Sequence, residues 1–207
     1  MFRSLDSMLG SAVVATDGQV GRAYNALIDD RLWAIRYLVV ETGSWFGHRR
    51  VLISPEALGS PNLIEEIIPV LLTKEQVQRS PDVETDRPVS RQREKCVLSS
   101  LGTHNPSAGA DSERTGDPHL RSAKELAGYH VDASDGSLGD IADFIVEDQG
   151  WGILDLVVDA GPSPDGHKVV IPTGWVSEVS WEDRSVRLNR PRSSEFLERN
   201  LMRLSHQ

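Results

Sequence analysis

The residues of this chain that could bind a metal or attack a substrate are few and scattered. No two of the six histidines lie four positions apart, and Cys96 is the only cysteine. Zinc sites are built from closely spaced Cys and His ligands, so we expect no bound metal. A single cysteine also allows no internal disulfide, which fits a reducing compartment.

Acidic pairs and glycine-rich turns offer little more chemistry. Asp29-Asp30 and Glu147-Asp148 could do acid–base work only in a desolvated pocket, and adjacent acids at the end of a strand are usually solvated. Asp17-Gly18 and Asp135-Gly136 lack the acidic spacing of a calcium loop and are too short for a nucleotide fingerprint, but they are strong hairpin signals. No Gly-x-Ser-x-Gly motif is present. We therefore expect neither an enzyme nor a cofactor.

Basic and aromatic loop residues are the candidates for protein contact. A histidine precedes basic residues in each half and could meet an acidic partner or titrate near neutral pH, although a solvated turn is the simpler interpretation. Tryptophans in loops or at strand ends could anchor an interface. The candidate contact residues are Trp45, Phe46, His48, Arg49, Arg50, His167, Lys168, Trp175 and Trp181.

The elements that must position these residues occur twice. Residues 3–43 align without a gap on residues 121–161, with 15 identities in 41 positions. What recurs is turn and core chemistry, which indicates a duplicated module. The repeated signature residues are Gly10, Asp17, Gly18, Gly21 and Trp33 in the first copy, and Gly128, Asp135, Gly136, Gly139 and Trp151 in the second.

Each copy has the pattern of several short strands. The strands expected in the first copy are 11–15, 24–29, 33–41, 50–53 and 67–72, and those in the second are 129–133, 142–147, 151–159, 168–171 and 185–188. Gly21 and Gly139 suggest bulges. Ser4 and Ser122 can each cap a single helical turn, and Thr73 with Gln76 fits a capping box at a short helix.

These patterns predict a mainly β protein with short helices and four parts. Residues 1–80 and 119–190 would each form a small barrel or sandwich. Residues 81–118 would be a long, partly disordered linker, with one short helix from Ser90, and residues 191–207 would form a C-terminal helix or tail.

Charge and hydropathy limit the classes of partner and the cellular compartments that we expect for this chain. The formal net charge is −9, and residues 119–207 alone carry 9 basic and 15 acidic residues. An acidic half repels a phosphate backbone, which disfavours nucleic acid as a partner. No signal peptide and no apolar run long enough to span a bilayer are recognisable, so we expect a cytoplasmic protein.

The motifs resemble those of the PRC-barrel family. The resemblance rests on Leu5-x4-Gly10, Asp17-Gly18-x2-Gly21, Trp33-x-Ile35-x2-Leu38-Val39-Val40, Val51-Leu52-Ile53-Ser54-Pro55 and Leu72-Thr73-Lys74-Glu75-Gln76-Val77. The second copy repeats the pattern from Leu120 to Leu188, and Pro88-Val-Ser-Arg-Gln-Arg-Glu is similar to the linker of bacterial tandem PRC-barrel proteins. The family takes its name from the cytoplasmic domain of the H polypeptide of the photosynthetic reaction centre.

The resemblance implies two tandem PRC-type β-barrels that make protein–protein contacts. The leading hypothesis is a non-catalytic interaction or adaptor protein, with homodimerisation as a further expectation because small barrels retain open edges. One alternative is an accessory of photosynthetic or respiratory electron transport in peripheral contact with a membrane complex. Others are a factor associated with ribosomes or RNA processing, and a sensor with a small ligand between the barrels. A buried cluster of ionisable residues at the domain junction would count against a purely scaffolding role.

Overall fold

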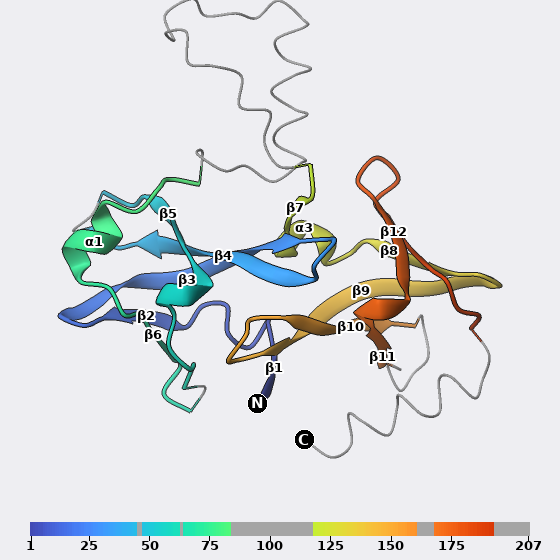
Figure 1. Ribbon diagram of the computed structural model, residues 1–207, viewed down its shortest axis with the longest axis horizontal. Coiled ribbons are helices and arrows are strands. Elements are labelled where there is room, and N and C mark those ends of the chain that lie inside the picture. The colour runs from blue at the N-terminus through green and yellow to red at the C-terminus, as the bar shows by residue number, and fades with distance from the viewer. Residues whose placement is uncertain (45–46, 63, 84–117, 161–167, 193–207) are drawn as a thin grey trace, which may run out of the picture.

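The computed structural model describes residues 1–44, 47–62, 64–83, 118–160 and 168–192. The chain is mainly β and forms two sheets that lie next to each other along the long axis of the molecule (Figure 1). The first sheet contains β2 (Ala12–Ala15), β3 (Gly18–Asp29), β4 (Ala34–Thr42), β5 (Arg50–Ile53), β6 (Ile67–Pro69) and β7 (Leu120–Ser122). The second contains β1 (Phe2–Ser4), β8 (His130–Ala133), β9 (Gly136–Glu147), β10 (Ile153–Asp159), β11 (Lys168–Pro172), β12 (Val176–Ser180) and β13 (Ser185–Leu188).

The two sheets have corresponding orders. The path β5-β4-β3-β2-β6 in the first sheet corresponds to β11-β10-β9-β8-β13 in the second, where β12 adds a further strand. Neighbours are antiparallel except for β2 with β6 and β8 with β13, which are parallel. Among the described strands, hydrogen bonding does not close either sheet into a barrel.

The helices within the described ranges are short. They are η2 (Pro55–Ala57), α1 (Lys74–Gln78), α3 (Ala123–Leu126) and η3 (Thr173–Trp175). Thr73 accepts a hydrogen bond from the Gln76 amide, and the Gln76 side chain accepts one from the Thr73 amide, so the predicted capping box is confirmed. Ser122 caps α3, as expected.

The glycines of the repeat explain the shape of the long strands. Pairing of β2 with β3 shifts register beside Gly21, and pairing of β8 with β9 shifts beside Gly139, which confirms the predicted bulges. A Cβ on Gly21 would lie 2.1 Å from the carbonyl oxygen of Glu41, so only glycine permits this approach of backbones.

Two of the predicted strands are too short. Segments 24–29 and 142–147 are the ends of the single twelve-residue strands β3 and β9, which run from the hairpin turn through the bulge without interruption. The bulge accommodates the bend, so the glycine does not end the strand. The expected strand 67–72 is too long, because β6 ends at Pro69.

Three strands lie outside the sequence prediction, and two of them change the architecture. β1 pairs with β9 of the second half, and β7 pairs with β3 of the first half. Each half therefore donates its first strand to the sheet of the other half, at the centre of the molecule in Figure 1. The third, β12, pairs with β13.

The exchanged strands help to build one continuous core. Buried residues of both halves, among them Leu5, Val40, Phe144 and Val158, belong to the same hydrophobic cluster. On the outer face of the first sheet, Val39 packs in a smaller cluster with Leu27, Leu52 and Leu120. Both faces of β4 are covered, as its apolar run predicts.

Candidate functional site

The two halves meet at two junctions related by the repeat. The Ile35 amide donates to the carbonyl of Trp151 at 2.8 Å, and the Ile153 amide donates to the carbonyl of Trp33 at 2.6 Å. Both tryptophans adopt left-handed backbone conformations, with φ of 48° and 56°, which are uncommon for bulky residues. The repeated tryptophans therefore belong to the junction as well as to the core.

A buried ion pair occupies the first junction. The Arg121 Nε donates to Asp30 Oδ2 at 2.5 Å, and His119 Nδ1 lies 2.8 Å from Asp30 Oδ1. The side chains of Arg121 and Asp30 are 10% and 6% exposed. Arg121 lies on β7 and Asp30 follows β3, so the exchange of strands creates the pair.

The equivalent pair occupies the second junction. Arg3 Nε donates to Asp148 Oδ2 at 2.9 Å, and the Met1 α-ammonium donates to Asp148 Oδ1 at 2.7 Å. Hydrogen bonds from the Met1 ammonium and then from Arg3 hold the pKa of Asp148 below its ordinary value, against the effect of burial. A carboxylate stabilised in its ionised form is poorly suited to general acid–base catalysis near neutral pH.

Side-chain hydrogen bonds also tie each exchanged strand to its host. The buried Asn25 side chain donates to Ser122 Oγ at 2.9 Å and accepts from the Lys124 amide at 3.2 Å. At the equivalent place in the other half, the Ser4 hydroxyl donates to Asp143. The exchange is thus fixed by polar contacts of defined geometry.

A pocket of about 490 Å³, here called the junction pocket, opens beside the first ion pair. Its lining residues are Asp30, Arg31, Trp33, His119, Arg121, Thr173, Gly174, Val176, Ser177, Glu178 and Val179. The Arg121 Nη1 atom is buried and has no hydrogen-bond partner. Buried donors are normally satisfied, so an unpaired Nη1 atom on a residue that lines the pocket needs an explanation.

A second concave surface, here called the Tyr24 groove, has a volume of about 550 Å³ and lies on the first sheet. Its lining residues are Tyr24, Asn25, Leu27, Val39, Glu41, His48, Arg49, Arg50, Asp82, Val83, Ser122, Lys124 and Glu125. The guanidinium carbon of Arg50 and the ammonium of Lys124 lie 3.7 Å and 3.8 Å from the centre of the Tyr24 ring. Two cations from different halves are therefore held over one aromatic side chain.

Acidic neighbours partly compensate the basic residues of the Tyr24 groove. Arg50 pairs with Glu41 at 3.1 Å, and Arg49 pairs with Asp82 at 3.4 Å. All four side chains are at least one-third exposed, so these pairs contribute little to stability and can be exchanged for contacts with a partner.

The structure brings three of the candidate contact residues together, namely His48, Arg49 and Arg50 in the Tyr24 groove. Lys168 is exposed at the start of the edge strand β11. Trp175 and Trp181 are half-buried, and Trp175 packs against the core. Trp45, Phe46 and His167 lie outside the described residues, as do the expected linker helix and residues 193–207 of the expected tail.

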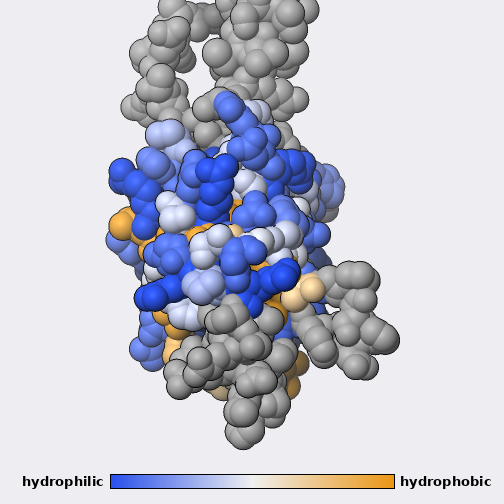
Figure 2. Space-filling view, turned by 90° about the vertical axis from the view of Figure 1, so that its right-hand side faces the viewer, coloured by the Kyte–Doolittle hydropathy of each residue, from blue (hydrophilic) through white to orange (hydrophobic). Residues whose placement is uncertain are grey.

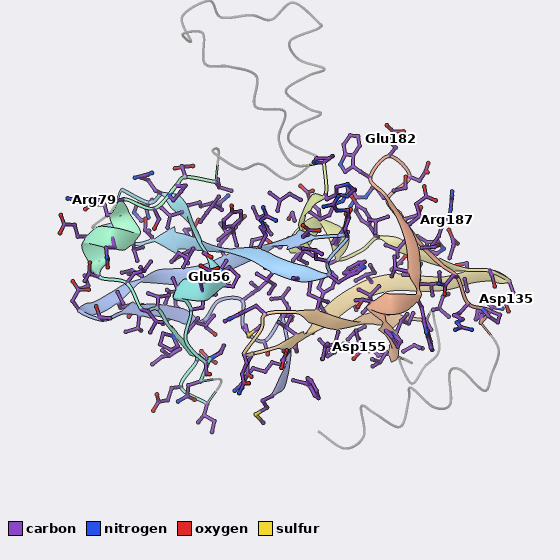
Figure 3. The ribbon with its side chains drawn as sticks, viewed as in Figure 1. Glu56, Arg79, Asp135, Asp155, Glu182 and Arg187 are labelled. Carbon is purple, nitrogen blue, oxygen red and sulfur yellow. The ribbon has the colours of Figure 1, made fainter. Side chains whose placement is uncertain are left out.

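The surface of the second half is mainly polar where it is described. Figure 2 shows this end of the molecule, with hydrophilic residues over most of the face and hydrophobic ones in isolated places. Figure 3 shows Glu182 and Arg187 on the β12–β13 hairpin, at the far side of the molecule from Arg79, which directly follows α1. Arg187 pairs with Glu178 at 2.7 Å, and both side chains are more than half exposed.

Sequence reasoning missed the ionisable cluster at the junction. The signal was present, because Arg3 with Arg121 and Asp30 with Asp148 are identical pairs of the repeat. The sequence pattern alone favours solvated acids at a turn, whereas in the structure their partners arrive from the other half. Within the described residues, no group of three or more His, Cys, Asp or Glu side chains could hold a metal ion.

Comparison with known proteins adds no assignment, because no family model and no curated protein matches the chain. In the part of the chain that the structure describes, no helix has the length and apolar character required to cross a membrane.

Proposed function

We propose that this chain is a non-catalytic interaction protein built of two PRC-type barrels and that it acts in the cytoplasm. The sequence motifs and their duplication support the family. The repeat preserves glycines, core residues and ion pairs rather than a nucleophile with its base, which supports a scaffold more than an enzyme.

The ionised state of Asp148 also supports this interpretation of the junction. Its depressed pKa and the equivalent pairing of Asp30 give both acids a structural role in joining the halves. The ion pairs of Asp30 and Asp148 are thus explained by their role in joining the halves, and no catalytic role is needed. A ligand bound beside them is compatible with the same scaffold.

The observation that carries the proposal is the convergence of predicted contact residues in the Tyr24 groove. A rigid sheet presents Tyr24, Arg49 and Arg50 on one concave surface, and Lys124 joins them from the other half. Tyr and Arg, together with Trp, are enriched among the residues that contribute most of the binding energy of interfaces. The partner would be a protein that presents carboxylates next to an apolar or aromatic side chain.

The test is affinity capture from native lysate, in soluble and detergent fractions, followed by mass spectrometry. The bait is the full chain as wild type, as the Arg49→Glu/Arg50→Glu double variant, and as the Arg187→Glu control. Arg187 is matched because it also forms an exposed cross-strand pair, but on the second half.

We expect a partner in the wild-type and control captures and a loss of about tenfold or more with the double variant. Recovery of native copies of the chain by the wild-type bait, and not by the double variant, would identify homodimerisation through this groove. A partner confined to the detergent fraction and belonging to a redox complex would favour the electron-transport alternative. Equal recovery of the partner by the double variant and by wild type would refute the assignment of the groove.

A further inference from the structure

The junction pocket is lined by a buried guanidinium, that of Arg121, in which one nitrogen atom lacks a hydrogen-bond acceptor. Arg121 uses Nε to bind Asp30, while its Nη1 atom has no partner. The residue is 9% exposed, so water in bulk does not satisfy the atom. An orphaned buried donor is rare in native proteins, and an acceptor from outside the chain is one explanation for it.

A second cation lines the same pocket. The backbone of Arg31 is held because its amide donates to Asp29 Oδ1 at 3.0 Å, as in an Asx turn. The Arg31 guanidinium forms no ion pair with any described residue, and the side chain is exposed at the pocket. The acid on the opposite wall, Glu178, is already paired with Arg187 at 2.7 Å.

Apolar side chains complete the wall. Trp33 is buried at the junction, and Val176 and Val179 are half-buried on β12. A mixed wall of this kind, with a few convergent polar groups and a volume near 490 Å³, falls in the size range of small-molecule sites.

The repeat shows that this arrangement is not simply a consequence of the fold. Gln149 occupies the position equivalent to Arg31, and Met1 occupies the position equivalent to His119. The ion pair is duplicated in both junctions, but the second cation of the pocket is present in only one of them.

We propose that the junction pocket binds a small organic anion. A carboxylate or phosphate oxygen would accept hydrogen bonds from the exposed Arg31 guanidinium and, after a small shift of the Arg121 side chain that opens its buried Nη1 atom to the pocket, from Arg121 as well. The apolar body of the ligand would lie against Trp33 and Val176. Guanidinium groups suit both oxyanions because their donors match the spacing of two oxygens. Binding would draw on residues of both halves and therefore depends on the exchange of strands.

The experiment is a titration of the full chain with small anions, near neutral pH and at constant ionic strength. Binding is monitored through the amide chemical shifts by NMR. The probes are sodium benzoate, which joins a carboxylate to an apolar ring, and sodium phosphate, each compared with sodium chloride. The variants are Arg31→Gln, Arg121→Lys and the control Arg3→Lys, which makes the same change at the equivalent junction.

We expect saturable shifts of the Gly174 and Ser177 amides with a Kd below about 10 mM for at least one probe. Arg31→Gln should weaken this binding by roughly tenfold, Arg121→Lys should weaken it at least as much, and Arg3→Lys should leave it unchanged. Saturation by benzoate alone assigns a carboxylate with an apolar body, and saturation by phosphate alone assigns a phosphate.

The absence of saturation by both probes would overturn the proposal, as would unchanged affinity in Arg31→Gln. Arg31 is exposed, so this variant keeps the proposal testable even if Arg121→Lys fails to fold. If the Arg49→Glu/Arg50→Glu variant loses the protein partner of the Tyr24 groove but still binds the probe, the anion site and the protein-interaction role are independent of each other.

Discussion

Replacement of Asp30 by alanine should destabilise the whole chain more than removal of any exposed acid. The variant leaves the Arg121 guanidinium, whose side chain is 10% exposed, without its carboxylate and with an Nη1 atom that already lacks a partner. Breaking a buried ion pair from one side typically costs about 3–5 kcal/mol. We therefore expect a loss of this size in the free energy of unfolding.

The other junction provides a graded comparison. Asp148→Ala leaves Arg3 and the Met1 ammonium without their carboxylate. The side chains of these two residues are 15% and 79% exposed, so water can reach their charged groups more easily than it reaches Arg121. The cost of Asp148→Ala should be smaller, roughly 1–3 kcal/mol. Glu178→Ala removes an acid that is 55% exposed and should cost no more than about 1 kcal/mol.

The assay is equilibrium unfolding in urea. With an m-value of about 2–3 kcal/mol per molar, the Asp30→Ala midpoint should fall by roughly 1–2 M. The expected order of destabilisation is Asp30→Ala, then Asp148→Ala, then Glu178→Ala, with unchanged m. An Asp30→Ala midpoint as high as that of Glu178→Ala would refute the reasoning. It would mean that loss of Asp30 does not leave Arg121 as a buried charge without a partner.

Three further predictions concern local features. Gly21→Ala places a Cβ 2.1 Å from the Glu41 carbonyl oxygen and should lower the free energy of unfolding by at least about 1–3 kcal/mol, measured in a thermal melt. In the control Gly152→Ala the new Cβ has nothing within 4 Å, so stability should change by no more than about 0.5 kcal/mol. The depressed pKa of Asp148 means that its ionised form contributes stability above the unfolded pKa of about 3.9, and this contribution is lost as pH falls through the folded value. The stability difference between wild type and Asp148→Asn should therefore shrink below about pH 4, and a difference that grows there would contradict the assignment. Thr73→Ala should cost about 1 kcal/mol through loss of the capping box, while Thr73→Ser should cost much less.

Local sequence patterns predicted most of the strands because the relevant physics is local. The turns at Asp17 and Asp135 join the expected hairpins, and strands such as β5 (Arg50–Ile53) and β13 (Ser185–Leu188) have the predicted bounds. Turn geometry and alternation between faces act over a few residues, so a single sequence displays them.

The exchange of strands could not be predicted in the same way. β1 and β7 have three residues each, too few to show a period, and both contain the same Arg-Ser pair. Either strand would therefore fit either sheet. The choice is made by long-range contacts, such as the hydrogen bond from the Leu5 amide to the Phe144 carbonyl at 2.9 Å.

The junction pocket was inaccessible to sequence reasoning for the same reason. Arg121 is separated from its partner Asp30 by 91 positions, and β12, which forms the opposite wall, lies outside the predicted strands. In contrast, His48, Arg49 and Arg50 are neighbours in the sequence, so their clustering in one groove could be foreseen.

The exchange of the first strands is the feature on which the shared core, both ion pairs and the junction pocket depend. Cross-strand nuclear Overhauser effects in the full chain test it most directly. The exchanged arrangement predicts contacts of Arg3 with Val146 and of Arg121 with Ile28. Contacts of Arg3 with Ile28 and of Arg121 with Val146 would show that each half keeps its own first strand, and would contradict the account.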